Sequence, residues 1–470
     1  MICAAFLLAG CSGFLNVNPK GEVFDADMFN SAEGYEDALY GVYSELATGD
    51  HLYAGNFFWV PEVLSQNVSS SDYKLGYMGR GDWYTTGPKG IREGMWTDAY
   101  KAVNHLNNIV AHAEKDGRDR FAHSGLYYGE AVALRALVHF ELLRLFGPPV
   151  WASASEKSTV IPYVSRYSFA LTPFGSLDEV FDAILSDLKL AESLLGEDET
   201  LVTAQRSNLA SGFTAARITH LNLYAVQALL ARVYWYRGDL PHAAEYARKV
   251  IDSGKFSFRN RSAFVQPDNG TLDMNETLFG FYSLKFNESN ARQYGLSGTS
   301  SATFELADDW NALYDDGSSV SRADYRINAW FDAGSSRLTK LANGIYYAGG
   351  TASYDGSAIL GANVLRLPEM YYILAEAHLA DHPAAARDAY NAVIVTRGLD
   401  ALPEDTPLTA AMLFRERRKE FYGEGLTWLQ MKRDAMDITT PEHSILPGSQ
   451  VSTYTLPVPD AESEARKNLN

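Results

Sequence analysis

Two segments of the chain carry the same succession of a helix, a tight turn and a second helix. The first spans residues 222–251 and the second spans residues 368–395. In both, alanine recurs where the two helices of a hairpin meet, and small side chains there let helix backbones approach closely. These alanines are Ala231, Ala243, Ala247, Ala375 and Ala389. Paired helices of this kind predict a layered, mainly helical fold.

The residue pattern of the two hairpins is similar to that of tetratricopeptide repeats, in which stacked helix pairs bury a continuous core. Neither segment carries the complete tetratricopeptide pattern, so a generic pair of antiparallel helices remains the alternative interpretation. Five further stretches show the same helical periodicity of apolar residues. They are residues 95–114, 129–146, 176–195, 409–423 and 426–434. Ser176 and Glu179 have the spacing of a capping box, which marks the start of a helix.

Two long stretches interrupt this helical pattern. Residues 50–94 and 255–364 are rich in Gly, Ser, Asn and Asp, with aromatic residues scattered singly among them. We expect irregular excursions with short strands on a helical scaffold. Long structured loops commonly carry function. We find no linker that separates domains, so residues 11–470 are predicted to form a single domain.

The N-terminus has the pattern of a bacterial lipoprotein signal. A short apolar run ends in Leu8-Ala9-Gly10-Cys11, and polar sequence follows at once. We interpret residues 1–10 as a signal peptide and Cys11 as the residue that receives lipid, palmitate included. The run is too short to cross a bilayer as a helix. No Lys or Arg precedes it, which departs from the usual signal peptide.

Charge and cysteine content exclude several functions. The net charge is −18, whereas nucleic-acid binding relies on cationic neutralisation of phosphates. Cys3 and Cys11 are the two cysteines of the chain, so the predicted mature protein has no internal disulfide and no cysteine-based metal site. No cofactor is expected. A calcium ion held by Asp308-Asp309 and Asp315-Asp316 stays an open possibility.

The strongest functional signal is the set of aromatic residues in the irregular stretches. A flat ring in a polar loop exposes apolar area, so it meets either a ligand or a local core. Both interpretations stay open for each ring, with Trp83 and Trp310 the leading candidates for ligand contact. The candidate ligand-binding residues are Asp72, Tyr73, Tyr77, Arg80, Trp83, Tyr84, Trp310, Tyr314 and Tyr346, and Trp330, Tyr347 and Tyr354 belong to the same aromatic set.

Two other clusters resemble active sites at first reading. The run 416–420, Glu-Arg-Arg-Lys-Glu, has the spacing of ion pairs along a helix, which favours a structural role. His378 and His382 lie four residues apart but lack the glutamate of the zinc-protease motif. Neither cluster predicts catalysis.

Motifs along nearly the whole chain, in order, resemble the SusD/RagB family of outer-membrane glycan-binding lipoproteins. Each motif alone is weak, and the ordered set is specific. Gln430 and the tail at 466–470 depart from the family's pattern. These motifs include Phe29-Asn-Ser-Ala-Glu, Ala38-Leu-Tyr-Gly-Val-Tyr, Ala133-Leu-Arg-Ala-Leu, Arg366-Leu-Pro-Glu-Met-Tyr-Tyr, Glu416-Arg-Arg-Lys-Glu-Phe-Tyr-Gly and Leu456-Pro-Val-Pro.

The resemblance implies four tetratricopeptide-like helix pairs that support a loop-rich face with short strands. It implies a lipid-anchored protein on the outer face of the outer membrane. It further implies non-catalytic binding of oligosaccharides and their delivery to a SusC-type TonB-dependent transporter. Two alternatives stay open: a helical-barrel glycoside hydrolase, which needs two carboxylates about 5–10 Å apart, and a tetratricopeptide-type scaffold for protein binding.

Overall fold

The computed structural model describes most of the chain. The predicted signal peptide at residues 1–10 and the predicted lipid site at Cys11 lie outside the described residues. The described ranges are 25–117, 119–204, 212–265, 271–298, 301–315, 324–332, 334–348, 350–354 and 358–467.

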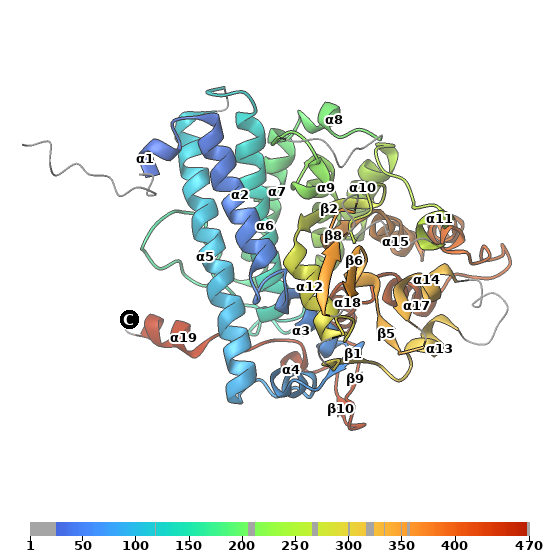
Figure 1. Cartoon of the computed structure of the whole chain (residues 1–470). Coiled ribbons are helices and arrows are strands. Elements are labelled where there is room, and N and C mark those ends of the chain that lie inside the picture. The colour runs from blue at the N-terminus through green and yellow to red at the C-terminus, as the bar shows by residue number, and fades with distance from the viewer. Residues whose placement is uncertain are drawn as a thin grey trace, which may run out of the picture.

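Four long helices lie side by side and form one half of the molecule (Figure 1). They are α2 (Ala32–Thr48), α5 (Thr86–Asp116), α6 (Ser124–Phe146) and α7 (Leu177–Leu194). The capping box predicted from Ser176 and Glu179 is present at the start of α7. The mostly helical fold is therefore confirmed.

Helix α6 is the centre of this half because it is apolar on every side. Its residues from Ala131 to Phe146 are all buried, as expected of a helix without a polar face. The charged side chains that it does carry are paired: Arg135 donates to both carboxylate oxygens of Asp187 at 2.7 and 2.9 Å. Within the described ranges, no helix has both the length and the hydropathy required to cross a membrane.

Two helical hairpins extend the layer, as their alanine pattern predicts. Helices α9 (Leu223–Arg237) and α10 (Leu240–Asp252) are joined at Gly238, whose φ of 91° is the left-handed conformation that glycine adopts freely. Helices α15 (Leu367–His378) and α16 (Pro383–Ile394) form the second hairpin, and α10 packs on α15. That these and other pairs are four tetratricopeptide-like units stays a prediction.

The strands are short and antiparallel, and in the described part of the chain they form two-stranded sheets. They are β1 (Val68–Ser70) with β3 (Phe304–Leu306), β2 (Thr277–Tyr282) with β8 (Gly361–Arg366), β4 (Phe331–Asp332) with β5 (Arg337–Leu338), β6 (Ile345–Ala348) with β7 (Thr351–Tyr354), and β9 (Ile438–Thr439) with β10 (Ile445–Leu446).

The stretch 50–94 is more helical than its composition indicates. It contains α3 (Asn56–Leu64) and α4 (Tyr73–Gly79), and α5 already begins at Thr86. Helix α3 is buried on nearly all sides and has Pro61 in its interior, so it shows neither amphipathic periodicity nor an uninterrupted helical pattern. Helix α4 is short and contains two glycines. Both features conceal helices from sequence patterns.

Shorter elements complete the fold and connect the layers. Helices α17 (Ala410–Glu420) and α18 (Thr427–Arg433) lie in the half of the molecule that carries the strands (Figure 1). The others are α1 (Asp25–Met28), α8 (Asp198–Leu201), α11 (Arg261–Val265), α12 (Leu284–Gln293), α13 (Trp310–Tyr314), α14 (Tyr325–Trp330), α19 (Asp460–Lys467) and the 3₁₀ turns η1 (Arg217–Thr219), η4 (Lys340–Ala342), η5 (Val395–Arg397) and η6 (Val451–Thr453).

A buried ion-pair network joins α17 to the neighbouring elements. The carboxylate of Glu420 accepts hydrogen bonds from Arg366 at 2.7 Å, Arg397 at 2.9 and 3.0 Å, and Arg326 at 3.0 Å. Burial raises the pKa of this carboxyl, but the positive charges of Arg397 and Arg366 more than offset that effect and hold the pKa well below its usual range. The run 416–420 therefore has the structural role that its spacing indicates.

We expect Glu420→Gln to lower the free energy of unfolding by about 3–5 kcal/mol, because removing one partner leaves buried charges uncompensated. The matched control is Glu245→Gln, which removes an exposed carboxylate that pairs with Lys249 at 3.5 Å and should change the free energy by less than about 1 kcal/mol. Urea denaturation followed by circular dichroism measures both. Equal effects of the two substitutions would contradict the structural role of Glu420.

Candidate functional site

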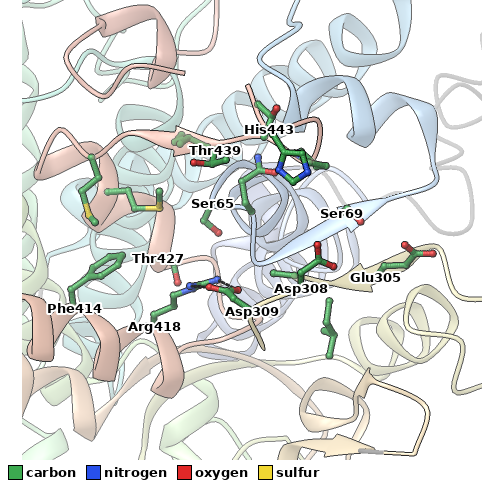
Figure 2. Close-up of a pocket in the computed structure, with 18 residues that line it drawn as sticks. Ser65, Ser69, Glu305, Asp308, Asp309, Phe414, Arg418, Thr427, Thr439 and His443 are labelled. Atoms are coloured by element: carbon green, nitrogen blue, oxygen red, sulfur yellow. Dashed lines mark hydrogen bonds and ion pairs between the residues drawn. The ribbon is translucent and has the colours of Figure 1, made fainter. Parts of the chain in front are cut away.

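A pocket of about 410 Å³ opens between the β1–β3 sheet, helices α17 and α18, and the β9–β10 hairpin. Figure 2 shows side chains from all of these elements around it. Its wall mixes hydroxyl, amide and charged groups with a few apolar side chains. The lining residues are Ser65, Gln66, Ser69, Glu305, Leu306, Ala307, Asp308, Asp309, Phe414, Arg418, Thr427, Met431, Met436, Ile438, Thr439, Thr440, Pro441 and His443.

The β1–β3 pairing assembles this pocket from distant parts of the chain. Val68 lies opposite Leu306 in the ladder, and the backbone N–H of Ser71 donates to the carbonyl of Thr303 at 2.9 Å. The ladder sets the segments that follow Ser65 and precede α13 next to each other. The two irregular stretches that the sequence singles out therefore meet at one place.

Arg418 is the fixed charged group of the pocket. Its guanidinium donates to both oxygens of Asp309 at 2.7 and 2.9 Å and to the amide oxygen of Asn67 at 2.8 Å. Asn67 in turn donates to the buried carboxylate of Glu62 at 2.9 Å. Burial lowers the pKa of Arg418, but the hydrogen bonds and charge of Asp309 raise it above its ordinary value. A two-point ion pair of this kind holds both side chains in one orientation.

Two further carboxylates face the pocket without a fixed partner. Glu305 and Asp308 are exposed, and neither side chain has a hydrogen bond or ion pair to another described residue. Figure 2 shows both carboxylates on the same side of the pocket as Asp309. Free acceptor oxygens next to a preorganised arginine suit a ligand that presents hydroxyl donors.

The β9–β10 hairpin forms the opposite rim and connects the pocket to α4. Its turn is closed by Thr440, whose backbone N–H donates to the carbonyl of Ser444 at 2.8 Å. Glu442, in the same turn, accepts a hydrogen bond from Arg80 at 3.2 Å. Gln66 reaches α4 from the pocket side and donates to the carbonyl of Gly79 at 2.8 Å. Helix α4 therefore contacts the hairpin through Arg80 and the pocket lining through Gln66.

Helix α4 presents the exposed rings of the predicted set. Tyr73 is 60% exposed and Tyr77 is 37% exposed, and their rings meet edge to face at 6.4 Å. The guanidinium of Arg80 lies over the Tyr77 ring at 4.8 Å. Asp72 has a different role: its carboxylate caps α4 by accepting from the backbone N–H of Lys74 at 2.9 Å.

Trp83 does not present its ring to a ligand. The residue is 6% exposed and belongs to the main hydrophobic core, which corrects the expectation of an exposed ring and favours the core alternative. The polar residues next to Trp83 in the sequence do not indicate this burial. Arg92 also turns inward and donates to the Trp83 carbonyl at 3.3 Å. The adjacent Tyr84 is 74% exposed.

The aromatic residues of the second stretch divide between core and surface. Tyr314 is fully buried, and its hydroxyl donates to the carbonyl of Lys419 at 2.6 Å, so it too belongs to the core. Trp330 is likewise buried. Trp310 is half-buried, and one face of its indole stacks on Phe331 at 4.8 Å. These rings fasten α13, and with it Asp308 and Asp309, to the core.

Tyr346 lies apart from the pocket. It is exposed on β6, in a hairpin that contacts α12 through the hydrogen bond from Tyr354 to Glu288. Tyr346 pairs with Ser353, one residue out of step with Tyr354, so the two tyrosines point to opposite faces of the hairpin. Tyr346 and Trp310 belong to the same irregular stretch of the sequence, but this does not bring them to one site.

Sequence reasoning missed most of the polar lining. Gln66, Thr439 and His443 stand in short segments without periodicity, and Arg418 is concealed in a charged helix run that otherwise has a structural role. Asp308 and Asp309 were noted only as possible calcium ligands. Asp309 is engaged by Arg418, and the described residues contain no group of three or more His, Cys, Asp or Glu side chains arranged to hold a metal ion.

Comparison with known proteins shows which family this chain is similar to. A family model described as "Starch-binding associating with outer membrane" (SusD-like) matches residues 14–235. A SusD-like protein of Bacteroides ovatus is 24% identical over 468 residues, which cover 91% of this chain and 80% of the relative. Solved structures of the SusD superfamily have the same fold, with TM-scores up to 0.74. Residues 14–235 therefore match the SusD-like family, and the chain as a whole has the SusD-like fold.

Other SusD-like proteins and structures are also similar to this chain. SusD-like protein P2 of Formosa agariphila is 25% identical over 301 residues, and the match spans half of that relative's length. A SusD superfamily structure from Bacteroides thetaiotaomicron is 20% identical, with 93% of this chain and 98% of that chain covered and a TM-score of 0.74. Surface glycan-binding protein A from Bacteroides fluxus is 19% identical, with 86% and 89% covered and a TM-score of 0.62.

The opposite environments of Trp83 and Tyr84 predict opposite responses to truncation. We expect Trp83→Ala to lower the free energy of unfolding by about 3–5 kcal/mol, since it leaves a cavity in the core. Tyr84→Ala should stay within about 0.5 kcal/mol of the parent protein. Urea denaturation of the two variants checks the difference. Unchanged stability in Trp83→Ala would contradict the burial of that ring and return it to the candidates for ligand contact.

Proposed function

We propose that this SusD-like protein binds oligosaccharides in the pocket between β1–β3 and β9–β10 and does not cut them. We further propose that it is held on the outer face of the outer membrane by lipid on Cys11 and delivers its ligand to a SusC-type TonB-dependent transporter. The family description supports a role in glycan binding at the outer membrane. The geometry of the pocket supports its use as the binding site.

The proposal rests on two observations: polar side chains line the pocket, and α4, which carries exposed rings, contacts the adjacent hairpin and the lining residue Gln66. Sugars have apolar C–H faces that pack on aromatic rings, and hydroxyl edges that need donors and acceptors. Tyr73 and Tyr77 provide ring surface on α4. Arg418, Glu305 and Asp308 provide the polar contacts across the pocket. Because the β1–β3 pairing holds two walls of the pocket together, we infer that the pocket is preformed.

The carboxylates of the pocket support binding rather than hydrolysis. A glycoside hydrolase needs a general acid that stays protonated near neutral pH, which an apolar, buried setting provides. Glu305 and Asp308 are exposed, and Asp309 is paired with Arg418. Incubation with a panel of glycans, followed by chromatography of the products, tests the absence of cleavage. Released sugars would overturn the non-catalytic proposal.

The transporter partner is inferred from the family alone, so it needs its own test. Full-length protein, expressed with the transporter gene that neighbours it, should co-purify with that barrel from detergent-solubilised membranes. A Cys11→Ser variant should lose the lipid and partition into the soluble fraction. Soluble behaviour of the unmodified protein would contradict the anchor, and recovery without the barrel would contradict the partner.

The rings of Tyr73 and Tyr77 should dominate ligand affinity. We expect the double variant Tyr73→Ala/Tyr77→Ala to bind the preferred oligosaccharide at least about tenfold more weakly, a loss of about 1.4 kcal/mol, with unchanged unfolding. Tyr167→Ala, which truncates an exposed tyrosine outside the pocket, is the matched control. Isothermal titration calorimetry against maltoheptaose, cellohexaose and xylohexaose measures the affinities. Equal affinity of all three proteins would rule out α4 as part of the site.

The charge of the pocket predicts which glycans it accepts. Glu305, Asp308 and Asp309 outnumber the single arginine of the lining, Arg418. Uronic-acid or sulfated oligosaccharides would place further negative charge beside unpaired carboxylates, whereas neutral sugars would not. We expect oligogalacturonate to bind at least about tenfold more weakly than a neutral oligosaccharide of equal length at low salt, and Glu305→Gln/Asp308→Asn to narrow the gap. Preferential binding of oligogalacturonate by the parent protein would contradict this charge selection.

A further inference from the structure

A second, larger hollow lies on another part of the surface. It measures about 920 Å³ and is bounded by the C-terminal half of α2, the segment 212–220 around η1, and the junction of β2 with α12. Figure 1 shows α2 beside α12 in the middle of the molecule, with β1 and β9 at the lower end. The lining of this trough shares no residue with that of the first pocket.

Two exposed rings line the trough. Tyr40 on α2 is 41% exposed and Tyr282 at the end of β2 is 63% exposed. The Tyr40 ring is held by edge-to-face contacts with Phe213 at 5.7 Å and His220 at 5.8 Å. A third exposed tyrosine, Tyr354, borders the trough through its hydrogen bond to Glu288. Exposed tyrosines thus gather at this trough as they do at α4.

Buried hydrogen bonds fix the walls of the trough. The wall behind Tyr40 is anchored on the buried carboxylate of Glu130, which lies 2.7 Å from the hydroxyl of Tyr43 and 3.0 Å from His220 Nδ1. On the other side, Ser283 donates to the carbonyl of Ala47 at 2.6 Å. These bonds hold α2 against both neighbours, so the trough is preformed.

A hydrogen bond and an ion pair of Lys285 connect α12 to the C-terminal end of α2 beside the trough. Lys285 Nζ donates to the carbonyl of Thr48 at 2.8 Å and pairs with Asp50 at 2.9 Å. The remaining polar lining is mainly hydroxyl groups, from Ser44, Thr48 and Thr219, with one carboxylate from Glu288. The lining charges nearly cancel. Rings and hydroxyls on rigid walls, with little net charge, match a neutral sugar chain better than an apolar peptide or an anion.

We propose that this trough is a second carbohydrate-binding surface that takes a neutral oligosaccharide segment between Tyr40 and Tyr282. The proposal rests on the proposed function of the first pocket as a glycan site. Two surfaces on one rigid body engage two segments of the same polysaccharide, and the second contact then forms at a high effective concentration. The first surface alone is sufficient to bind short oligosaccharides, whereas the two surfaces together retain a polymer.

The test compares Tyr40→Ala/Tyr282→Ala with the α4 double variant Tyr73→Ala/Tyr77→Ala. Tyr282→Ala alone serves if loss of the Tyr40 packing lowers the melting temperature, and Tyr167→Ala is the control. The probes are maltoheptaose, cellohexaose and xylohexaose with their polymers, soluble starch, hydroxyethylcellulose and arabinoxylan. Calorimetry measures affinity and stoichiometry, and hydrogen exchange reports protection of segments 40–48 and 281–288.

We expect the parent protein to bind two oligosaccharides per chain and the Tyr40→Ala/Tyr282→Ala variant to bind one, with loss of protection at both segments. Its affinity for the matching polymer should fall at least about tenfold. One bound oligosaccharide in the parent protein, and no change in the trough variant, would overturn the second surface and leave the first intact. No binding or protection with any of these glycans would overturn both.

Discussion

The buried carboxylate of Glu420 holds together segments that are far apart in the chain. Its three arginine partners come from α14, from the last residue of β8 and from η5. An arginine left unpaired in this interior costs several kcal/mol, so these segments keep one mutual arrangement. Helix α17, which ends at Glu420, also carries Arg418 into the first pocket. The position of this pocket-lining guanidinium therefore depends on the core network.

Helices α5, α6 and α7 could be predicted because each buries one face or nearly its whole surface and has recognisable residues at its ends, whereas α2 was not among the predicted helices. The capping box at Ser176 and the glycine at 238 mark real boundaries. Helices α3 and α4 could not be predicted, since burial on nearly all sides and Pro61 obscure α3, and two glycines obscure the short α4. Local patterns report the periodicity of a surface, and an element without a solvent face leaves no such pattern.

The candidate site shows the same division. The exposure of the α4 rings could be predicted because a ring in a polar segment is a local signal, and their contact with a ligand stays a prediction. The burial of Trp83 could not be predicted, because it depends on core residues remote in sequence. The lining by Gln66, Asp308 and Arg418 depends on the pairing of β1 with β3, a contact between segments that are far apart in the sequence. Such pairings are set by tertiary structure, so one sequence alone does not reveal them.

Arg418 and Glu420 occupy the same short helix, one reaching the pocket and the other the core. Most of the remaining lining comes from three segments with little part in that network: 65–69, 305–309 and 439–443. Substitutions in those segments change the shape and charge of the pocket while α17 stays in place. Pockets of different shape and charge can therefore form beside the same α17, which fits a fold retained at about 20% identity.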